Sequence, residues 1–124
     1  MNAIEKLLVP ANTVLCRNIL VDTHTHTLRD DVYDGYLAGF GPAVITSGLI
    51  QTLATYAADD KRKKVLDAIA EVAAISSTTT ADKLLAVCLD SHSNKPQLNI
   101  WRNKIIDASI ALKMMIRTYK KPKK

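Results

Sequence analysis

Aromatic residues, glycines and long apolar runs are all scarce in this sequence of 124 residues. It has only six aromatic residues and four glycines, whereas alanine alone occurs fifteen times. Aromatic and β-branched residues favour strands, while alanine, leucine and lysine favour helices. No segment comes near the roughly eighteen uninterrupted apolar residues of a membrane-spanning helix. We therefore expect an all-α fold that spans no membrane, a compact bundle of about five or six helices with a long C-terminal helix.

Cysteine is also scarce, and the two cysteines show no pairing motif. Cys16 and Cys88 each lie within apolar stretches, without CxxC or metal-ligand spacing. We expect both to be buried free thiols, as in proteins of the reducing cytoplasm. The apolar run over residues 7–10 is too short for the core of a secretory signal peptide. The expected location is therefore cytoplasmic.

The length and composition fit one globular domain. With 48% hydrophobic and 23% charged residues, the composition is expected neither for a disordered polar tract nor for a membrane protein. No internal repeat or composition break divides it. We expect a single helical domain over residues 1–119, followed by a basic tail over residues 120–124.

Positive charge is concentrated at the C-terminal end. Residues 1–60 carry three Lys or Arg against seven Asp or Glu, residues 61–100 carry six against four, and residues 101–124 carry eight against one. The net charge of +5 therefore arises entirely from the second half of the chain. A basic end on a balanced domain suggests a polyanionic partner, usually nucleic acid, and the alternative is a tail that only increases solubility.

Apolar residues recur at helical spacing in six segments, which we predict to be helices: 11–22, 28–40, 42–58, 61–73, 81–89 and 98–119. Pro10 is expected near a helix start or a break, and residues 22–27 are expected to form a loop. Gly39, Gly41 and Pro42 are predicted to separate the second helix from the third. Gly48 falls inside the third helix, so we expect a close helix contact there to compensate for its low helix propensity.

The third and last predicted helices carry regular apolar lines. In the third, Ile45, Leu49, Leu53 and Ala57 recur every four residues. In the last, two sets recur every seven residues and form one continuous seam: Leu98, Ile105, Leu112 and Tyr119, with Trp101, Ala108 and Met115.

Basic residues follow one edge of that seam. At 100° per residue, Arg102, Lys113, Arg117 and Lys120 form a stripe along the last helix, which could follow successive phosphates. Residues 61–64 supply a second basic cluster at the start of the fourth helix. The candidate RNA-binding residues are therefore Lys61, Lys64, Arg102, Lys113, Arg117 and Lys120. The alternative is an ordinary solvated helix edge.

A His24-Thr25-His26 segment follows an apolar run, as do paired metal ligands in amidohydrolase-type barrels. Such a barrel needs about 250 residues and further ligands, which this chain lacks, so a surface loop is the better interpretation. A divalent metal bound by His24, His26 and Asp22 is the alternative. Acidic residues at positions 30, 31 and 34 suit a helix N-terminus better than general acid–base work. No nucleophile motif or phosphate loop is present, so we expect no enzyme activity, no cofactor and no metal.

A spaced pattern lies within residues 36–54, comprising Tyr36, Pro42, Ile45, Gly48, Leu49, Gln51, Leu53 and Ala54. This pattern resembles the signature region of the small, all-helical subunit of type III-B CRISPR (Cmr) effector complexes. Members of that family usually show Leu-Pro, then Ile, then Asn-Gly-Leu and an apolar run ending in an aromatic residue. Here Gly41 replaces the Leu, Ser47 replaces the Asn, and Tyr56 would supply the aromatic residue. The Ala111-Leu112-Lys113 run in a long basic closing helix also looks like the family.

The resemblance implies a non-catalytic RNA-binding subunit in antiviral defence. It would stack with copies of itself and with other Cmr-type effector subunits, lining the groove where guide RNA and target RNA pair, without a membrane. The similar small subunit of type III-A complexes is a near alternative. Two alternatives come from other classes: a helical adaptor that binds a protein through the exposed part of residues 48–56, and a small metal hydrolase built on His24 and His26.

Overall fold

Six helices and one two-stranded hairpin make up the part of the chain that the computed structural model describes, residues 3–17, 19–74 and 81–122. In chain order they are α1 (Ala3–Leu15), β1 (Val21–Asp22), β2 (Thr27–Leu28), α2 (Val32–Ser47), α3 (Leu49–Ala58), α4 (Asp60–Ala74), α5 (Ala81–Asp90) and α6 (Lys95–Ile116). The expected all-α bundle with a long C-terminal helix is confirmed. None of the helices in these ranges is long and apolar enough to cross a membrane.

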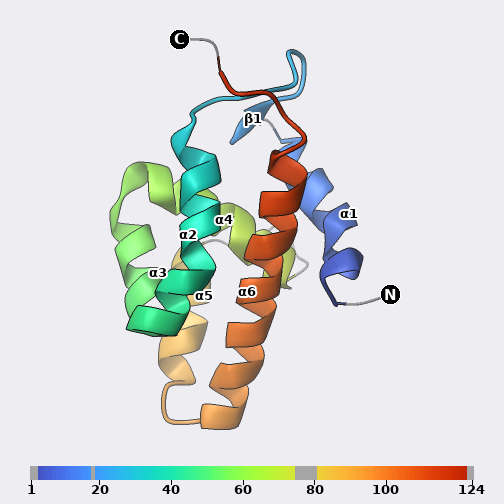
Figure 1. The fold of residues 1–124 in the computed structure, drawn as a ribbon. Coiled ribbons are helices and arrows are strands. Elements are labelled where there is room, and N and C mark those ends of the chain that lie inside the picture. Colours follow the sequence, from blue (N-terminus) through green and yellow to red (C-terminus); the bar gives the residue numbers. More distant parts are fainter. Residues whose placement is uncertain (1–2, 18, 75–80, 123–124) are drawn as a thin grey trace.

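Helix α6 is the packing partner of three other helices. It lies against α1, α2 and α4, and Figure 1 shows it running along the molecule beside α2, with α1 on its other side. Its side chains Ile105, Ala108 and Leu112, all members of the predicted seam, are fully buried. The other seam members are partly buried against the same core: Leu98, Trp101, Met115 and Tyr119. The predicted seam is therefore confirmed as part of the core.

Helix α6 begins and ends three residues earlier than predicted. It begins earlier because its first turn has its own capping residue. The side-chain oxygen of Asn94 accepts a hydrogen bond from the Gln97 amide at 3.2 Å. Pro96 fits within this first turn, where its missing N–H would have no helical acceptor. At the other end, the Arg117 amide donates to the Lys113 carbonyl, and the chain then leaves the helix.

Helix α2 continues through residues 39–42, where the sequence predicted a boundary. Its buried side chains keep helical spacing across this segment: Tyr33, Leu37, Phe40 and Val44. Burying that stripe outweighs the backbone hydrogen bond lost at Pro42, so the predicted break is wrong. The helix also begins at Val32 rather than at Leu28, because Leu28 belongs to β2.

The break between α2 and α3 lies at Gly48. Its backbone has φ +92° and ψ 156°, a conformation almost restricted to glycine. The expected position inside a helix and the expected close contact are both wrong, since a Cβ on Gly48 would meet no described atom within 4 Å. The predicted line of four apolar residues is also broken here. Ile45, its first member, is 70% exposed because it lies one residue beyond the buried Val44 on α2.

Helix α1 begins at Ala3 and includes Pro10, although the sequence predicted a helix over residues 11–22. The carbonyl of Lys6, four residues before Pro10, receives no helical N–H. Because Lys6 is exposed, this carbonyl can bond water instead. The buried face of the last turns carries Ala11 and Leu15, which favours continuing the helix across the proline.

Residues 21–28 form a short antiparallel hairpin, whereas the sequence predicted a loop over residues 22–27 between two helices. Val21 pairs with Leu28 and Asp22 pairs with Thr27, and both apolar residues of these pairs are buried. Asp22 Oδ1 accepts a hydrogen bond from the His24 amide at 2.9 Å, which shapes the turn. Histidine at position 26 adopts φ +56°, a left-handed conformation that closes the turn.

The two cysteines differ in burial. Cys88 on α5 is buried as expected, and burial raises the pKa of its thiol to about 11. Cys16 is exposed, so the expectation for that residue is wrong. It follows the buried Leu15 and therefore points away from the core.

The fourth and fifth helices lie close to their predicted ranges. Asp59 Oδ2 accepts a hydrogen bond from the Arg62 amide at 3.0 Å, which stabilises the N-terminus of α4. Residues 75–80, between α4 and α5, lie outside the described residues.

Candidate nucleic-acid interface

The first two residues of the predicted basic stripe lie on one side of α6. Arg102 and Lys113 are three helical turns apart, about 16 Å along the axis, and differ by only about 20° in direction. Both side chains are partly exposed. The two cations can therefore contact one strand of a polyanion together.

Arg117 lies just beyond α6 as its C-cap residue, and its guanidinium is bonded to α2. Its Nε donates to Asp34 Oδ1 at 3.1 Å. The side chains of Arg117 and Asp34 are 54% and 32% exposed, so this is a surface ion pair. The carboxylate offsets part of the charge that Arg117 brings to the stripe.

Lys120 does not continue the helical stripe, because α6 ends before it. Its backbone instead pairs with the hairpin as an added parallel bridge to Thr27. The Lys120 amide donates to the His26 carbonyl at 2.9 Å, and the Leu28 amide donates to the Lys120 carbonyl at 2.8 Å. The backbone at Lys120 is thus fixed against β2.

The His26 ring holds the same segment from the side. It stacks on the Tyr119 ring with centroids 4.2 Å apart. Its Nε2 lies 2.9 Å from the Thr118 carbonyl oxygen, and since a carbonyl only accepts, Nε2 carries the proton and donates. The histidine that the sequence offered as a metal ligand therefore holds residues 118–120 against the hairpin.

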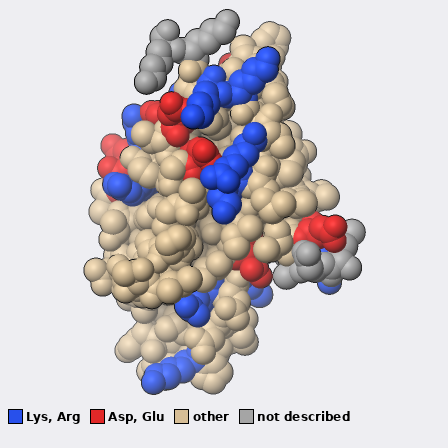
Figure 2. Space-filling model, viewed as in Figure 1, with Lys and Arg blue, Asp and Glu red and all other residues tan. Residues whose placement is uncertain are grey.

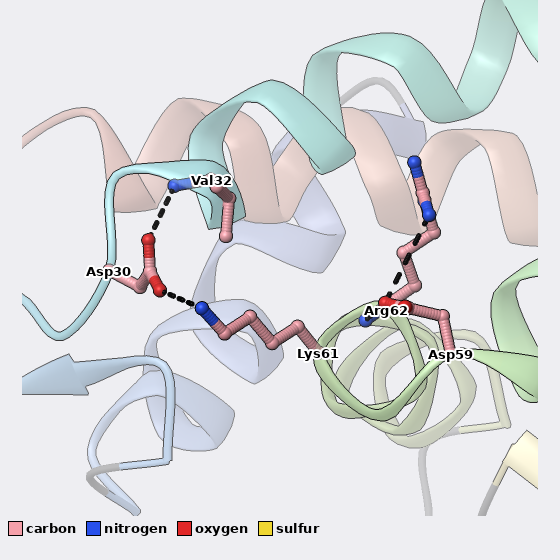
Figure 3. Close-up of polar contacts among 5 residues, drawn as sticks. All are labelled: Asp30, Val32, Asp59, Lys61 and Arg62. Atoms are coloured by element: carbon pink, nitrogen blue, oxygen red, sulfur yellow. Dashed lines mark hydrogen bonds and ion pairs between the residues drawn. The ribbon is translucent and has the colours of Figure 1, made fainter.

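Lys61 lies on α4 and faces the start of α2 (Figure 3). Its Nζ donates to Asp30 Oδ2 at 2.7 Å. This hydrogen bond lowers the pKa of the Asp30 carboxyl, to which the Val32 amide also donates, and raises the pKa of Lys61. Lys61 is 55% exposed, so it can still reach solvent while its charge is matched locally.

The other basic residues of the 61–64 cluster point in several directions. The Arg62 guanidinium lies 4.6 Å from the centre of the Tyr36 ring, and Lys63 Nζ lies 3.2 Å from Asp82 on α5. Lys64 lines a small cavity of about 40 Å³ next to Arg17 and Glu71, which form an ion pair at 2.7 Å. The cations of the cluster therefore have separate partners: Lys61 and Arg62 contact residues at the start of α2 or on it, Lys63 contacts α5, and Lys64 lies beside Arg17 and Glu71.

A groove near the end of α6 brings together residues that the sequence did not group. Its volume is about 410 Å³, and it is lined by Leu28, Asp34, Ile116, Arg117, Tyr119 and Lys121. Lys121 was predicted only as part of a tail. Its place in the groove could not be predicted from the sequence. The hairpin that holds the preceding residues 118–120 has no helical spacing and no turn motif of its own, so it was not predicted either.

Figure 2 shows where the charges lie on the face that carries α2 and α6. Lys and Arg side chains gather over its upper part, toward the C-terminal end of the chain, and more are found lower down. Asp and Glu side chains lie among the upper group. The two carboxylates at the start of α2, Asp30 and Asp34, which the sequence assigned to a helix N-terminus, pair with Lys61 and Arg117.

The proposed metal ligands do not come together in this structure. Among the described residues, no three His, Cys, Asp or Glu side chains are grouped so as to hold a metal ion. Asp22 bonds to the backbone of its own turn, and His26 bonds to Thr118. These side chains therefore stabilise the hairpin and its contact with residues 118–120.

No protein-family model, no characterised protein and no solved structure matches this chain. The resemblance carried by residues 36–54 therefore stays a prediction from the sequence.

Proposed function

We propose that this chain is a non-catalytic small subunit of a type III-B CRISPR (Cmr) ribonucleoprotein effector complex, acting in antiviral defence in the cytoplasm. In this proposal it stacks along the complex with copies of itself and binds guide or target RNA through its basic surface. The observation that carries the proposal is the alignment of Arg102 and Lys113 on one side of α6. The all-helical fold and the signature-like pattern within residues 36–54 also support it.

The six candidate residues differ in what they can contribute. Lys61 and Arg117 each pair with a carboxylate of α2, and Lys64 lies beside Arg17 and Glu71. A cation already paired in the free protein releases less counterion when it meets a phosphate. Arg102, Lys113 and Lys120 are therefore the residues that we expect to contribute most to RNA affinity.

Exposed apolar side chains support contacts with neighbouring subunits. Val87 and Leu89 lie near the end of α5 and Ile100 near the start of α6, with exposures of 37%, 47% and 49%. These helix ends are joined by a short connection at the lower end of the molecule in Figure 1. Subunits that stack would cover such residues.

The test is RNA binding by the full chain and by the complex isolated with it, titrated at several salt concentrations. The double variant Arg102→Glu with Lys113→Glu should lower the slope of log affinity against log salt by about 1.4, since each phosphate contact of a single strand contributes about 0.7. Base sequence should matter little. A control variant, Lys6→Glu on α1, changes the charge of an exposed residue that is not part of the stripe and should leave the slope unchanged. An unaltered slope for the double variant in the isolated complex would contradict the proposal.

A second candidate function is a helical adaptor that binds a protein beside residues 48–56. The observations that favour it are the 70% exposed Ile45 and, separately, a cavity of about 110 Å³ between α2 and α3. That cavity is lined by Ala43, Ser47, Gln51, Thr52, Thr55 and Tyr56. Ile45→Asp would abolish partner binding by an adaptor while leaving RNA binding intact, which separates the two functions.

A further inference from the structure

The lining of the groove near the end of α6 includes both charged and apolar residues. Arg117 and Lys121 place two cations along it, against the single carboxylate of Asp34. The lining also includes three apolar residues, of which Tyr119 is partly exposed and Leu28 and Ile116 are buried. A ligand that fits must combine a negative group with a flat or apolar part.

The cations of this groove can serve an external anion although one of them is paired. Asp34 engages Arg117 through Nε, and the guanidinium has further N–H donors on its terminal nitrogens. The ion pair thus orients the guanidinium and leaves donors for a second acceptor. Lys121 is exposed and lines the same groove, so it adds a second cation.

We propose that this groove binds a nucleotide of single-stranded RNA, with its phosphate on Arg117 and Lys121 and its base or ribose against Tyr119. The inference rests on the proposed function and assigns it a specific site. A base inside a duplex is stacked on both faces and cannot turn toward Tyr119, whereas an unpaired base can. The groove also continues the basic stripe of α6, because Arg117 lies one turn beyond Lys113.

His26 acts in this site as a positioning residue. Its ring lies against Tyr119 and donates to the Thr118 carbonyl, and its backbone carbonyl accepts from Lys120. These contacts fix the residues on either side of Tyr119. They therefore also determine the direction in which the chain continues to Lys121. His24, two residues earlier, is exposed at the tip of the turn and provides a matched control.

The experiment measures binding of a fluorescent single-stranded oligouridine of roughly ten nucleotides to the full chain at several salt concentrations centred on about 0.1 M. Lys121→Ala should weaken binding about fivefold and lower the salt slope by about 0.7, the contribution of one phosphate contact. His26→Asn should weaken binding as well, since asparagine accepts the left-handed backbone but lacks the ring that holds Tyr119. His24→Asn makes the same chemical change and should have no effect. A blunt-ended duplex RNA should show no difference among the three variants.

The outcomes separate this inference from the proposed function. Normal oligouridine binding by Lys121→Ala, together with the expected loss in the Arg102/Lys113 double variant, would overturn the groove and leave the RNA-binding function standing. No RNA binding by the parent chain, alone or in its isolated complex, would overturn both. Because Lys121 is exposed and outside the core, its variant decides the matter even if His26→Asn destabilises the fold.

Discussion

Arg117 donates from Nε to Asp34 Oδ1 at 3.1 Å, which ties the residue after α6 to the first turn of α2. Lys61 makes the equivalent contact from α4, through Asp30. Two helices are thus fixed to the start of α2 by their basic residues. The charge gradient read from the sequence is partly balanced in the folded protein, because acidic residues of the N-terminal half meet basic residues of the C-terminal half.

Substituting the two partners of this ion pair should change RNA binding in opposite directions. Arg117→Gln removes a phosphate contact and should weaken binding of single-stranded RNA about fivefold at 0.1 M salt. Asp34→Asn removes a competing negative charge and should strengthen binding roughly twofold. Each should cost at most about 1 kcal/mol of stability, as expected for an exposed pair. Fluorescence titrations and thermal melts of both variants check this, and equal effects on binding would contradict it.

Gly48 should be sensitive to any side chain, and to a similar degree for small and large ones. Its φ of +92° disfavours every residue with a Cβ, at a cost of about 1–3 kcal/mol, while the surrounding space would accept the added atoms. We expect Gly48→Ala and Gly48→Leu to lower the free energy of unfolding by similar amounts. Gly39→Ala, within α2, is the control and should be neutral or stabilising by up to about 1 kcal/mol. Denaturant unfolding measures all three, and a far larger loss for leucine than for alanine would indicate a steric contact instead.

The buried thiol of Cys88 should make stability depend on alkaline pH. Burial raises its pKa from 9.0 to about 11, so between these values the unfolded chain holds fewer protons than the folded protein at this site. The contribution of Cys88 to stability is therefore complete below pH 9 and declines as pH rises toward 11, by at most about 1.4 kcal/mol per pH unit. The measurement compares urea unfolding of Cys16→Ser with that of Cys16→Ser/Cys88→Ala across this range. The difference between the two should shrink with pH, and a constant difference would contradict the burial effect.

Much of the helical architecture was predictable because apolar spacing dominates it. The seam of α6 and the stripes of α4 and α5 follow from periodic burial, which the sequence displays directly. The prediction failed at glycine and proline. At residues 39–42, burial of the apolar stripe from Tyr33 to Val44 outweighs the local preference for a helix break. Gly48 was expected to be tolerated inside a helix, but its positive φ makes it the break between two helices.

The candidate interface was predictable only in part, for a different reason. Helical geometry correctly placed Arg102 and Lys113 on one side of α6, since both lie inside the helix. It misplaced Lys120, because the position of this residue depends on backbone pairing with the hairpin. The two contacting segments are far apart in the sequence, since His26 and Thr118 are separated by 92 positions. Contacts between distant segments leave no periodic trace, so neither the role of His26 nor the groove at Lys121 could be derived from the sequence.

The pairing of the hairpin with residues 118–120 also implies an order of assembly. Bringing together segments 92 positions apart costs about 4 kcal/mol of chain entropy if nothing else holds them near one another. An isolated two-stranded hairpin is at best marginally stable in water, so it cannot offset that cost alone. Docking of α6 onto α1 and α2 must therefore come first. Once these helices have docked, the hairpin and residues 118–120 are already close, so their pairing costs little further chain entropy. The hairpin and the end of the described chain should therefore be the last part to fold and the first to open.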